Sequence, residues 1–241
     1  MRSSEHLGAL LILVALSSGC SGQRRVGNPL DQLRSGEYLR EDYIGALCET
    51  LSPLKATRPD ADPQLFILGS DKDGAYLMPI RNFHEGDDPH RVSREGMLQR
   101  IESGPDRITD TGLSFKARGT ESFSLMKGSS ELSFRFVEVA DRWVSTSVIA
   151  GKYQDAMGKE YIFQPNGKAA FPGDRQFDYT LAMDHVLMGY DYIYSKQLGA
   201  TWMVKIDSKS LTLYETRGDI GEIASATPKC QLTRRTAAAC E

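Results

Sequence analysis

The sequence predicts a mostly β protein of the α+β class, in which a short N-terminal amphipathic helix precedes an antiparallel β-meander that is sandwich-like or barrel-like. Three observations lead to this fold class. Apolar residues recur with a helical period only near the start of the chain, short runs of aromatic and β-branched residues follow, and turn residues separate those runs. Hydrophobic residues make up 40% of the 241 positions, which favours a packed core over disorder.

The first element in chain order is the uncharged apolar run from Leu7 to Leu16. Ten residues of helix rise about 15 Å, roughly half the hydrocarbon core of a bilayer, so the run is typical of a signal-peptide core. It ends in Leu-Ser-Ser-Gly-Cys at 16–20, which resembles the lipobox of bacterial lipoproteins, with Ser17 where the commonest form has Leu.

The lipobox resemblance implies cleavage after Gly19, a signal peptide over 1–19 and a lipid on Cys20. The chain would then be bound to a membrane of the cell envelope through this lipid, with residues 20–34 as the tether. Ser21 after the cysteine implies the outer membrane, facing the periplasm, in a Gram-negative cell. A plain secretory signal with an incidental cysteine remains the alternative, and either signal exports the chain.

The next predicted element is an amphipathic helix between Ser35 and Ser52. Leu39, Tyr43, Leu47 and Leu51 recur every four residues, and Pro53 prevents continuation. A second, shorter helix is predicted from Ser93 to Ile101 on the clustering of its apolar residues.

The rest of the chain carries β patterns. Two hairpins are predicted, each with a turn segment between two apolar runs, and two further strands alternate apolar and polar residues. The hairpins are Leu65–Leu68 with Ala75–Met78 and Tyr161–Phe163 with Lys168–Phe171; the strands are Leu132–Phe136 and Leu211–Tyr214.

These elements divide into an N-terminal half (35–142), a C-terminal half (143–232) and a tail (233–241). The segment 123–134 aligns without gaps on 202–213, and Gly74 and Pro79 align on Gly167 and Pro172 in a second register. An ancient duplication and two unrelated hairpins of common β pattern both explain this likeness. The C-terminal half resembles a lipocalin meander in its broad pattern, without a lipocalin signature.

Four cysteines are present, and export permits disulfides. With Cys20 lipidated, Cys48, Cys230 and Cys240 allow one bridge and one free thiol. We predict a bridge between Cys230 and Cys240, which are close in sequence. A bridge from Cys48 to the end of the chain, or no bridge, are the alternatives.

The densest group of metal-ligand residue types lies at 84–90, where His84, Glu85, Asp87, Asp88 and His90 offer imidazole and carboxylate ligands for a divalent ion. Their spacing matches no zincin pattern, and a solvated acidic loop explains the same residues. We therefore treat this group as an alternative metal site.

These patterns indicate the general class of function but not the ligand. A net charge of −3 argues against a basic nucleic-acid binder, and no catalytic residue or cofactor is assigned. We expect an exported, lipid-anchored, non-catalytic binding or structural module, whose partner is an envelope protein or a small-molecule ligand. A divalent-metal-binding protein or hydrolase using the His84–His90 loop is the alternative. Several aromatic residues fit either a ligand cavity or core packing: Tyr179, Tyr190, Tyr192, Tyr194, Trp202 and Tyr214.

Overall fold

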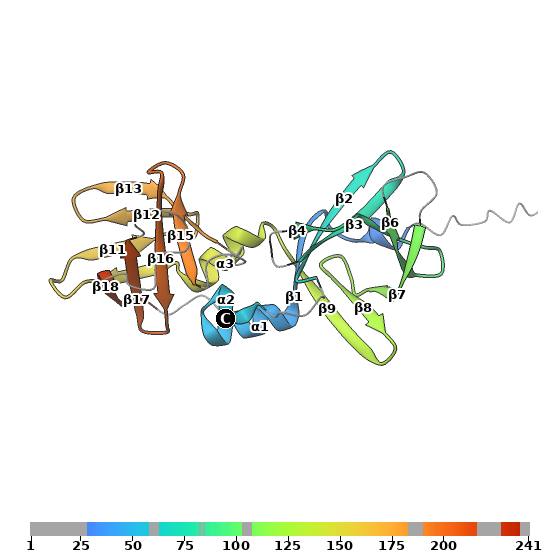
Figure 1. Cartoon of the computed structure of the whole chain (residues 1–241), viewed down its shortest axis with the longest axis horizontal. Coiled ribbons are helices and arrows are strands. Elements are labelled where there is room, and N and C mark those ends of the chain that lie inside the picture. The colour runs from blue at the N-terminus through green and yellow to red at the C-terminus, as the bar shows by residue number, and fades with distance from the viewer. Residues whose placement is uncertain are drawn as a thin grey trace, which may run out of the picture.

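The fold is a pair of antiparallel β barrels joined by a helical layer, as seen in a computed structural model (Figure 1). The structure describes residues 28–57, 63–81, 83, 85–102, 108–182, 190–215 and 228–236. The predicted signal peptide, Cys20 and Cys240 lie outside these residues. The predicted fold class is confirmed.

The N-terminal half forms a nine-stranded sheet in which strands adjacent in the chain pair, except that β5 pairs with β3 and the two-residue β4 is a side branch on β3. The last strand, β9, pairs with the first, β1, and β2 also pairs with β3, so the sheet closes into a barrel. The elements of this half are η1 (Pro29–Gln32), β1 (Gly36–Arg40), α1 (Glu41–Thr50), α2 (Pro53–Ala56), β2 (Leu65–Asp71), β3 (Gly74–Arg81), β4 (Glu85–Gly86), β5 (His90–Val92), β6 (Met97–Ile101), β7 (Ile108–Ala117), β8 (Ser122–Lys127) and β9 (Ser130–Val137).

The period-2 alternation of side chains explains the two surfaces of this N-terminal barrel. Tyr38, Phe66 and Phe134 belong to the cluster that fills the barrel, whereas Leu39 and Val137 belong to a different cluster outside it. The barrel therefore has an apolar interior and an apolar outer wall on β1, β2 and β9.

The C-terminal half forms a second nine-stranded sheet, in which β10 pairs with both β11 and β18. Its two edge strands, β13 and β14, are separated in the chain only by Tyr179, so the sheet curls into a nearly closed barrel. The elements are α3 (Ala140–Val148), β10 (Gly151–Gln154), β11 (Glu160–Phe163), β12 (Lys168–Phe171), β13 (Arg175–Asp178), β14 (Thr180–Leu181), β15 (Asp191–Ser195), β16 (Ala200–Ile206), β17 (Ser210–Glu215) and β18 (Pro228–Arg234).

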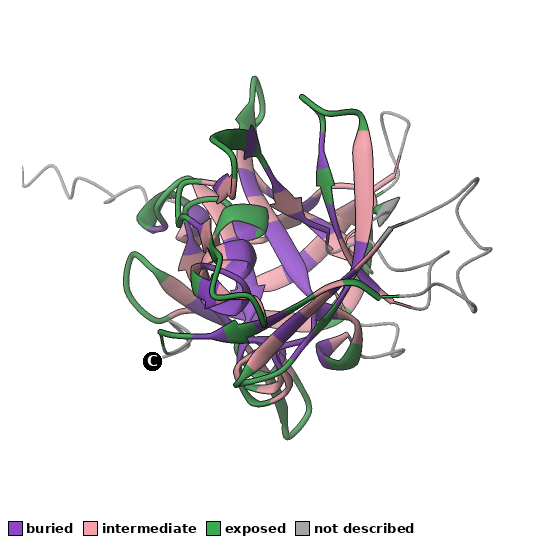
Figure 2. Cartoon of the chain, turned by 90° about the vertical axis from the view of Figure 1, so that its left-hand side faces the viewer, coloured by how far each residue is buried: buried purple, intermediate pink, exposed green. Residues whose placement is uncertain are grey.

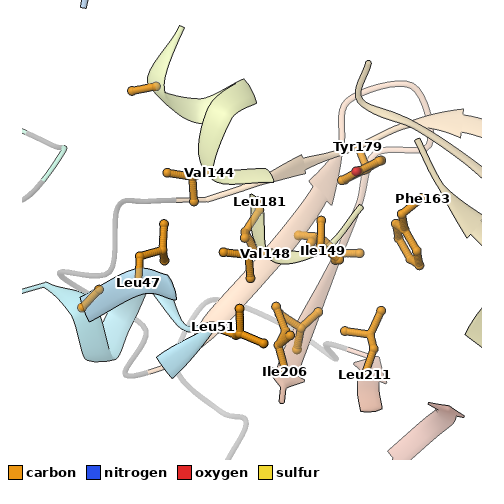
Figure 3. Close-up of a cluster of buried hydrophobic side chains, with 14 of the residues drawn as sticks. Leu47, Leu51, Val144, Val148, Ile149, Phe163, Tyr179, Leu181, Ile206 and Leu211 are labelled. Carbon is orange, nitrogen blue, oxygen red and sulfur yellow. The ribbon is translucent and has the colours of Figure 1, made fainter. Parts of the chain in front are cut away.

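Helices α1 and α3 lie between the barrels and close one end of the C-terminal barrel (Figure 1). Figure 3 shows Leu47 and Leu51, from α1 and its C-terminal cap, in one cluster with Val148 of α3 and with Leu181 and Ile206 of the barrel. This cluster also includes the apolar outer wall of the N-terminal barrel. The two halves therefore share this cluster, whereas the interior of the N-terminal barrel forms a second one.

A buried carboxylate adds a polar connection between the halves. Asp191, at the start of β15, is 6% exposed, and its Oδ1 accepts a hydrogen bond from the Leu54 backbone N–H at 2.8 Å. Its Oδ2 accepts a short hydrogen bond from the Ser52 hydroxyl. Because Ser52 is also the N-cap of α2, Asp191 fixes the start of this helix against the C-terminal barrel.

Two helix predictions require correction. The helix predicted over 35–52 begins only at Glu41, because Gly36–Arg40 is the central strand β1 between β2 and β9. The helix predicted over 93–101 is wrong: Ser93–Gly96 is a turn with Gly96 at φ +81°, and Met97–Ile101 is β6. Helix α3 was not predicted, because Val, Ser, Thr and Trp, which make up most of it, are weak helix formers. The boundary proposed at 142/143 lies inside this helix.

The two halves resemble each other in strand order, but the two registers inferred from the sequence cannot both hold. If α1 is aligned with α3, the hairpin β8–β9 corresponds to β16–β17, as the first register requires. In that alignment β3, which contains Gly74 and Pro79, corresponds to β11 and not to β12. The strand that pairs with both β2 and β9 is then β1, and the corresponding strand that pairs with both β10 and β17 is β18. β1 comes first and β18 last among the described strands of the chain.

Candidate functional site

A cavity of about 440 Å³ opens into the C-terminal barrel at the end remote from α1 and α3. Figure 2 views the molecule from this side and shows buried residues in the middle with exposed turns around them. The cavity lies beside the β12–β13 and β15–β16 turns, at the ends of the strands that do not meet the helices. It is lined by Tyr161, Phe171, Asp174, Arg175, Gln176, Phe177, Leu198, Trp202, Leu213, Lys229 and Cys230.

Aromatic rings form much of the cavity wall, and each ring packs against the next. The Tyr161 and Phe171 ring centroids are 4.9 Å apart, those of Phe171 and Phe177 are 4.9 Å apart, and those of Phe177 and Trp202 are 5.5 Å apart. Edge-to-face and tilted contacts at these separations are favourable and restrict ring rotation. The wall is therefore a preformed apolar surface.

The polar groups inside the cavity are a phenol and a thiol. The Tyr161 hydroxyl donates to Asp155 Oδ2 at 3.3 Å and also interacts with the Cys230 thiol. Burial raises the pKa of Tyr161 and of Cys230 above their ordinary values. Since only the thiolate is a good nucleophile, Cys230 is a poor candidate for covalent catalysis at neutral pH.

The rim of the cavity carries charge and exposed apolar surface. The turn between β12 and β13 places Gly173 at φ +82° and Asp174 at φ +58°, and it presents Arg175 to the opening. Within the described residues Arg175 forms no salt bridge. Leu198, in the turn between β15 and β16, lines the cavity and is 52% exposed.

In its described part, the predicted metal loop pairs its carboxylates with arginines. Asp87 accepts hydrogen bonds or ion pairs from Arg81 at 2.7 Å and Arg100 at 3.1 Å, and Asp88 pairs with Arg100 at 2.8 Å. His90 Nδ1 lies 2.8 Å from the Asp88 carbonyl oxygen.

His84 and the side chain of Glu85 lie outside the described residues. Among the residues that the structure describes, no three His, Cys, Asp or Glu side chains form a metal-binding group. The metal site therefore stays a prediction, and in the described part of the loop arginines from β3 and β6 pair with Asp87 and Asp88.

His90 predicts a pH-dependent stability. Burial lowers its pKa below the ordinary value of 6.5, with a smaller contribution from Arg100, and the side chain is 7% exposed. The unfolded chain therefore binds one more proton than the folded chain as the pH falls below about 6.5, which lowers stability by at most about 1.4 kcal/mol per pH unit.

We expect His90→Gln to remove this part of the pH dependence. The measurement is urea unfolding at about pH 7.5 and about pH 5.5 for both chains. If the original and variant chains lost the same free energy of unfolding between these two pH values, His90 would not be a source of the pH dependence.

The cysteine prediction is also corrected. Cys230 is a free thiol that faces the cavity, so it is not bridged to Cys240. Cys48 is disulfide-bonded, and its partner lies outside the described residues. The physical reason is the register of β18, in which Cys230 pairs with Leu213 and its side chain points inward beside Tyr161.

Most of the cavity was not predicted. Of the aromatic residues singled out in the sequence, Trp202 lines the cavity and Tyr179 is buried below it, next to Phe163 at 5.1 Å. Tyr194 lies on the opposite face of β15 from the buried Ile193 and is 39% exposed. Phe171, Phe177 and Cys230 were missed, although the strand alternation marks them as inward-facing once the meander is assumed.

No protein-family model, curated protein or solved structure matches this chain. The resemblance of the C-terminal half to lipocalins therefore consists only of the general pattern of a meander that curls into a nearly closed barrel. Within the described residues no helix is both long enough and apolar enough to span a membrane.

Proposed function

We propose that this chain is an exported lipoprotein, anchored through Cys20, whose C-terminal barrel binds a small apolar molecule in the cavity described above. The observation that carries the binding function is the preformed aromatic wall around about 440 Å³ of open space. Ligand sites are commonly concave, largely apolar and of about 300–1,000 Å³, with a few polar groups. Barrels of eight strands are wide enough to hold one small ligand, and the C-terminal sheet has nine strands.

The anchor is supported by the lipobox pattern at 16–20 and by the apolar run before it. The described chain starts in the N-terminal barrel, since Leu30 and Leu33 of the first segment pack in its core. The cavity opens on the far side of the other barrel. We therefore propose that the site faces away from the anchoring membrane, toward the periplasm if the cell is Gram-negative.

Binding of a neutral fluorescent probe tests the cavity. We use the chain from residue 20 onward with Cys20→Ser, which retains every described residue, and titrate N-phenyl-1-naphthylamine. The original chain should bind it with a Kd in about the micromolar range, and Trp202→Ala should weaken binding about tenfold because it removes one aromatic wall.

Trp143 of α3 provides the matched control, because it lies in the helical layer and does not line the cavity. Trp143→Ala should leave the Kd within about twofold. Absence of binding to the original chain, or equal weakening in both tryptophan variants, would rule out this cavity as the site.

A further inference from the structure

The cavity joins an apolar interior to a charged opening, and this division suggests the class of ligand. The interior consists of Tyr161, Phe171, Phe177, Trp202 and Leu213. The opening carries Arg175 and Lys229 together with the carboxylate of Asp174. A purely apolar ligand would leave the charged opening unused. A ligand with an apolar body and an anionic end would contact both regions.

Arg175 is the strongest candidate for the anion contact. It follows the tight turn at 172–174, in which Gly173 and Asp174 have positive φ, so its backbone position at the opening is well defined. Its guanidinium has no acidic partner among the described residues. A planar guanidinium offers paired N–H donors that match carboxylate and phosphate oxygens.

The cavity volume limits the apolar part. If each group of the ligand takes about 30 Å³, the volume that one water molecule occupies in the liquid, then about 440 Å³ holds on the order of 15 non-hydrogen atoms. A single acyl chain of about ten carbons with a small head group fits this size, whereas a complete two-chain lipid does not.

We infer that the cavity takes an anionic amphiphile, a single medium-length acyl or similar apolar chain whose carboxylate or phosphate binds at Arg175 with Lys229 nearby. This inference rests on the proposed function, because it specifies the ligand of the same cavity. Leu198, half exposed at the rim, would be covered by the part of the chain next to the head group.

The test compares ligands that differ only in the head group. Decanoate, decyl phosphate and decanol compete for the bound neutral probe in the Cys20→Ser chain, each below its micelle concentration. Decanoate or decyl phosphate should bind about tenfold more tightly than decanol. Whichever anion binds more tightly distinguishes a carboxylate from a phosphate ligand.

Variants at Arg175 test whether the charge of this side chain, and not a change in the structure of the cavity, accounts for anion binding. Arg175→Gln should weaken decanoate binding about five- to tenfold and change decanol binding by less than about twofold, and Arg175→Lys should restore part of the difference. The matched control is Lys168→Gln, because Lys168 is an exposed cation at the opposite end of the β12–β13 hairpin. This control should bind every ligand as the original chain does.

A second readout locates the ligand. Bound decanoate should slow alkylation of Cys230 by a maleimide, measured on the Cys230 peptide by mass spectrometry, because the thiol lines the cavity. Equal affinities for decanoate and decanol, with no effect of Arg175→Gln, would overturn the anionic head group but leave the proposed function intact. Failure of all three ligands and of the neutral probe would overturn both.

Discussion

Replacement of Phe123 by alanine is expected to lower the free energy of unfolding by about 3–5 kcal/mol. Phe123 is fully buried at the centre of the N-terminal barrel. Its ring lies 4.9 Å from that of Phe134, 5.2 Å from Phe115 and 5.3 Å from Tyr38. Alanine leaves a cavity that the rings on these three strands cannot all move to fill, so both the burial and the aromatic contacts are lost.

The measurement for Phe123→Ala also tests whether the two barrels unfold together. Trp202 lies in the C-terminal barrel and Trp143 in the helical layer, so their fluorescence reports on parts of the chain outside the mutated barrel. Because β1 and β9 contribute side chains both to the cluster around Phe123 and to the cluster shared with the C-terminal barrel, we expect the tryptophan transition in urea to shift by the full change in stability. Ile108→Ala, at a position that is 64% exposed, should change stability by less than about 0.5 kcal/mol.

A tryptophan transition that stays unchanged in Phe123→Ala, while far-ultraviolet circular dichroism shows an earlier loss of strand, would mean that the barrels unfold separately. That outcome would contradict the coupling of the two halves through the shared cluster around α1 and α3.

Replacement of Asp191 by alanine is expected to cost about 2–4 kcal/mol, although it removes only one carboxylate. The Ser52 hydroxyl and the Leu54 N–H both donate to this carboxylate, and Ser52 is 4% exposed. Without Asp191 the buried Ser52 hydroxyl and the partly buried Leu54 N–H lose their acceptor.

A double-mutant cycle with Ser52→Ala measures the coupling directly. Ser52→Ala removes one donor to Asp191 together with the cap of α2, so the double variant should be less destabilised than the sum of the single variants by about 1–2 kcal/mol. Strict additivity would show that the two side chains do not act together. Asp174→Asn, at the exposed β12–β13 turn, is the control for removing a carboxylate charge and should change stability by less than about 0.5 kcal/mol.

The β-rich fold class could be predicted because turn residues and alternating runs are local signals. The hairpins around 72–73 and 164–167 are examples, since strand, turn and strand all lie within a few residues. Barrel closure could not be predicted in this way. It depends on pairings such as β1 with β9, in which Glu37 lies opposite Val137, one hundred residues away in the chain.

The helix errors have a related cause. Leu39 fits a four-residue apolar repeat with Tyr43 and Leu47, but in the structure it is the outward-facing residue of a strand that packs on the same helical layer. One apolar cluster thus receives side chains from two kinds of element, and the sequence pattern alone does not separate them.

The candidate cavity was missed for a similar reason. Its wall combines residues of six strands, and only Trp202 stood out as a possible ligand contact from the sequence. The His84–His90 group stood out more strongly because its residues are adjacent, yet in the described part Arg81 and Arg100, from flanking strands, occupy the carboxylates. Adjacency in sequence drew attention to this group, whereas the cavity is assembled from residues of separate strands.

The helical layer has a consequence for how this chain can be divided. The apolar face of α1 and its C-terminal cap, with Leu47 and Leu51, is contributed by the N-terminal half but is covered by the C-terminal barrel. A cut between Val137 and Ala140 would leave each fragment with an uncovered apolar surface, which favours aggregation. The two barrels are therefore not interchangeable modules. A recombinant or a proteolytic fragment carrying only one of them would need a substitute for the missing surface.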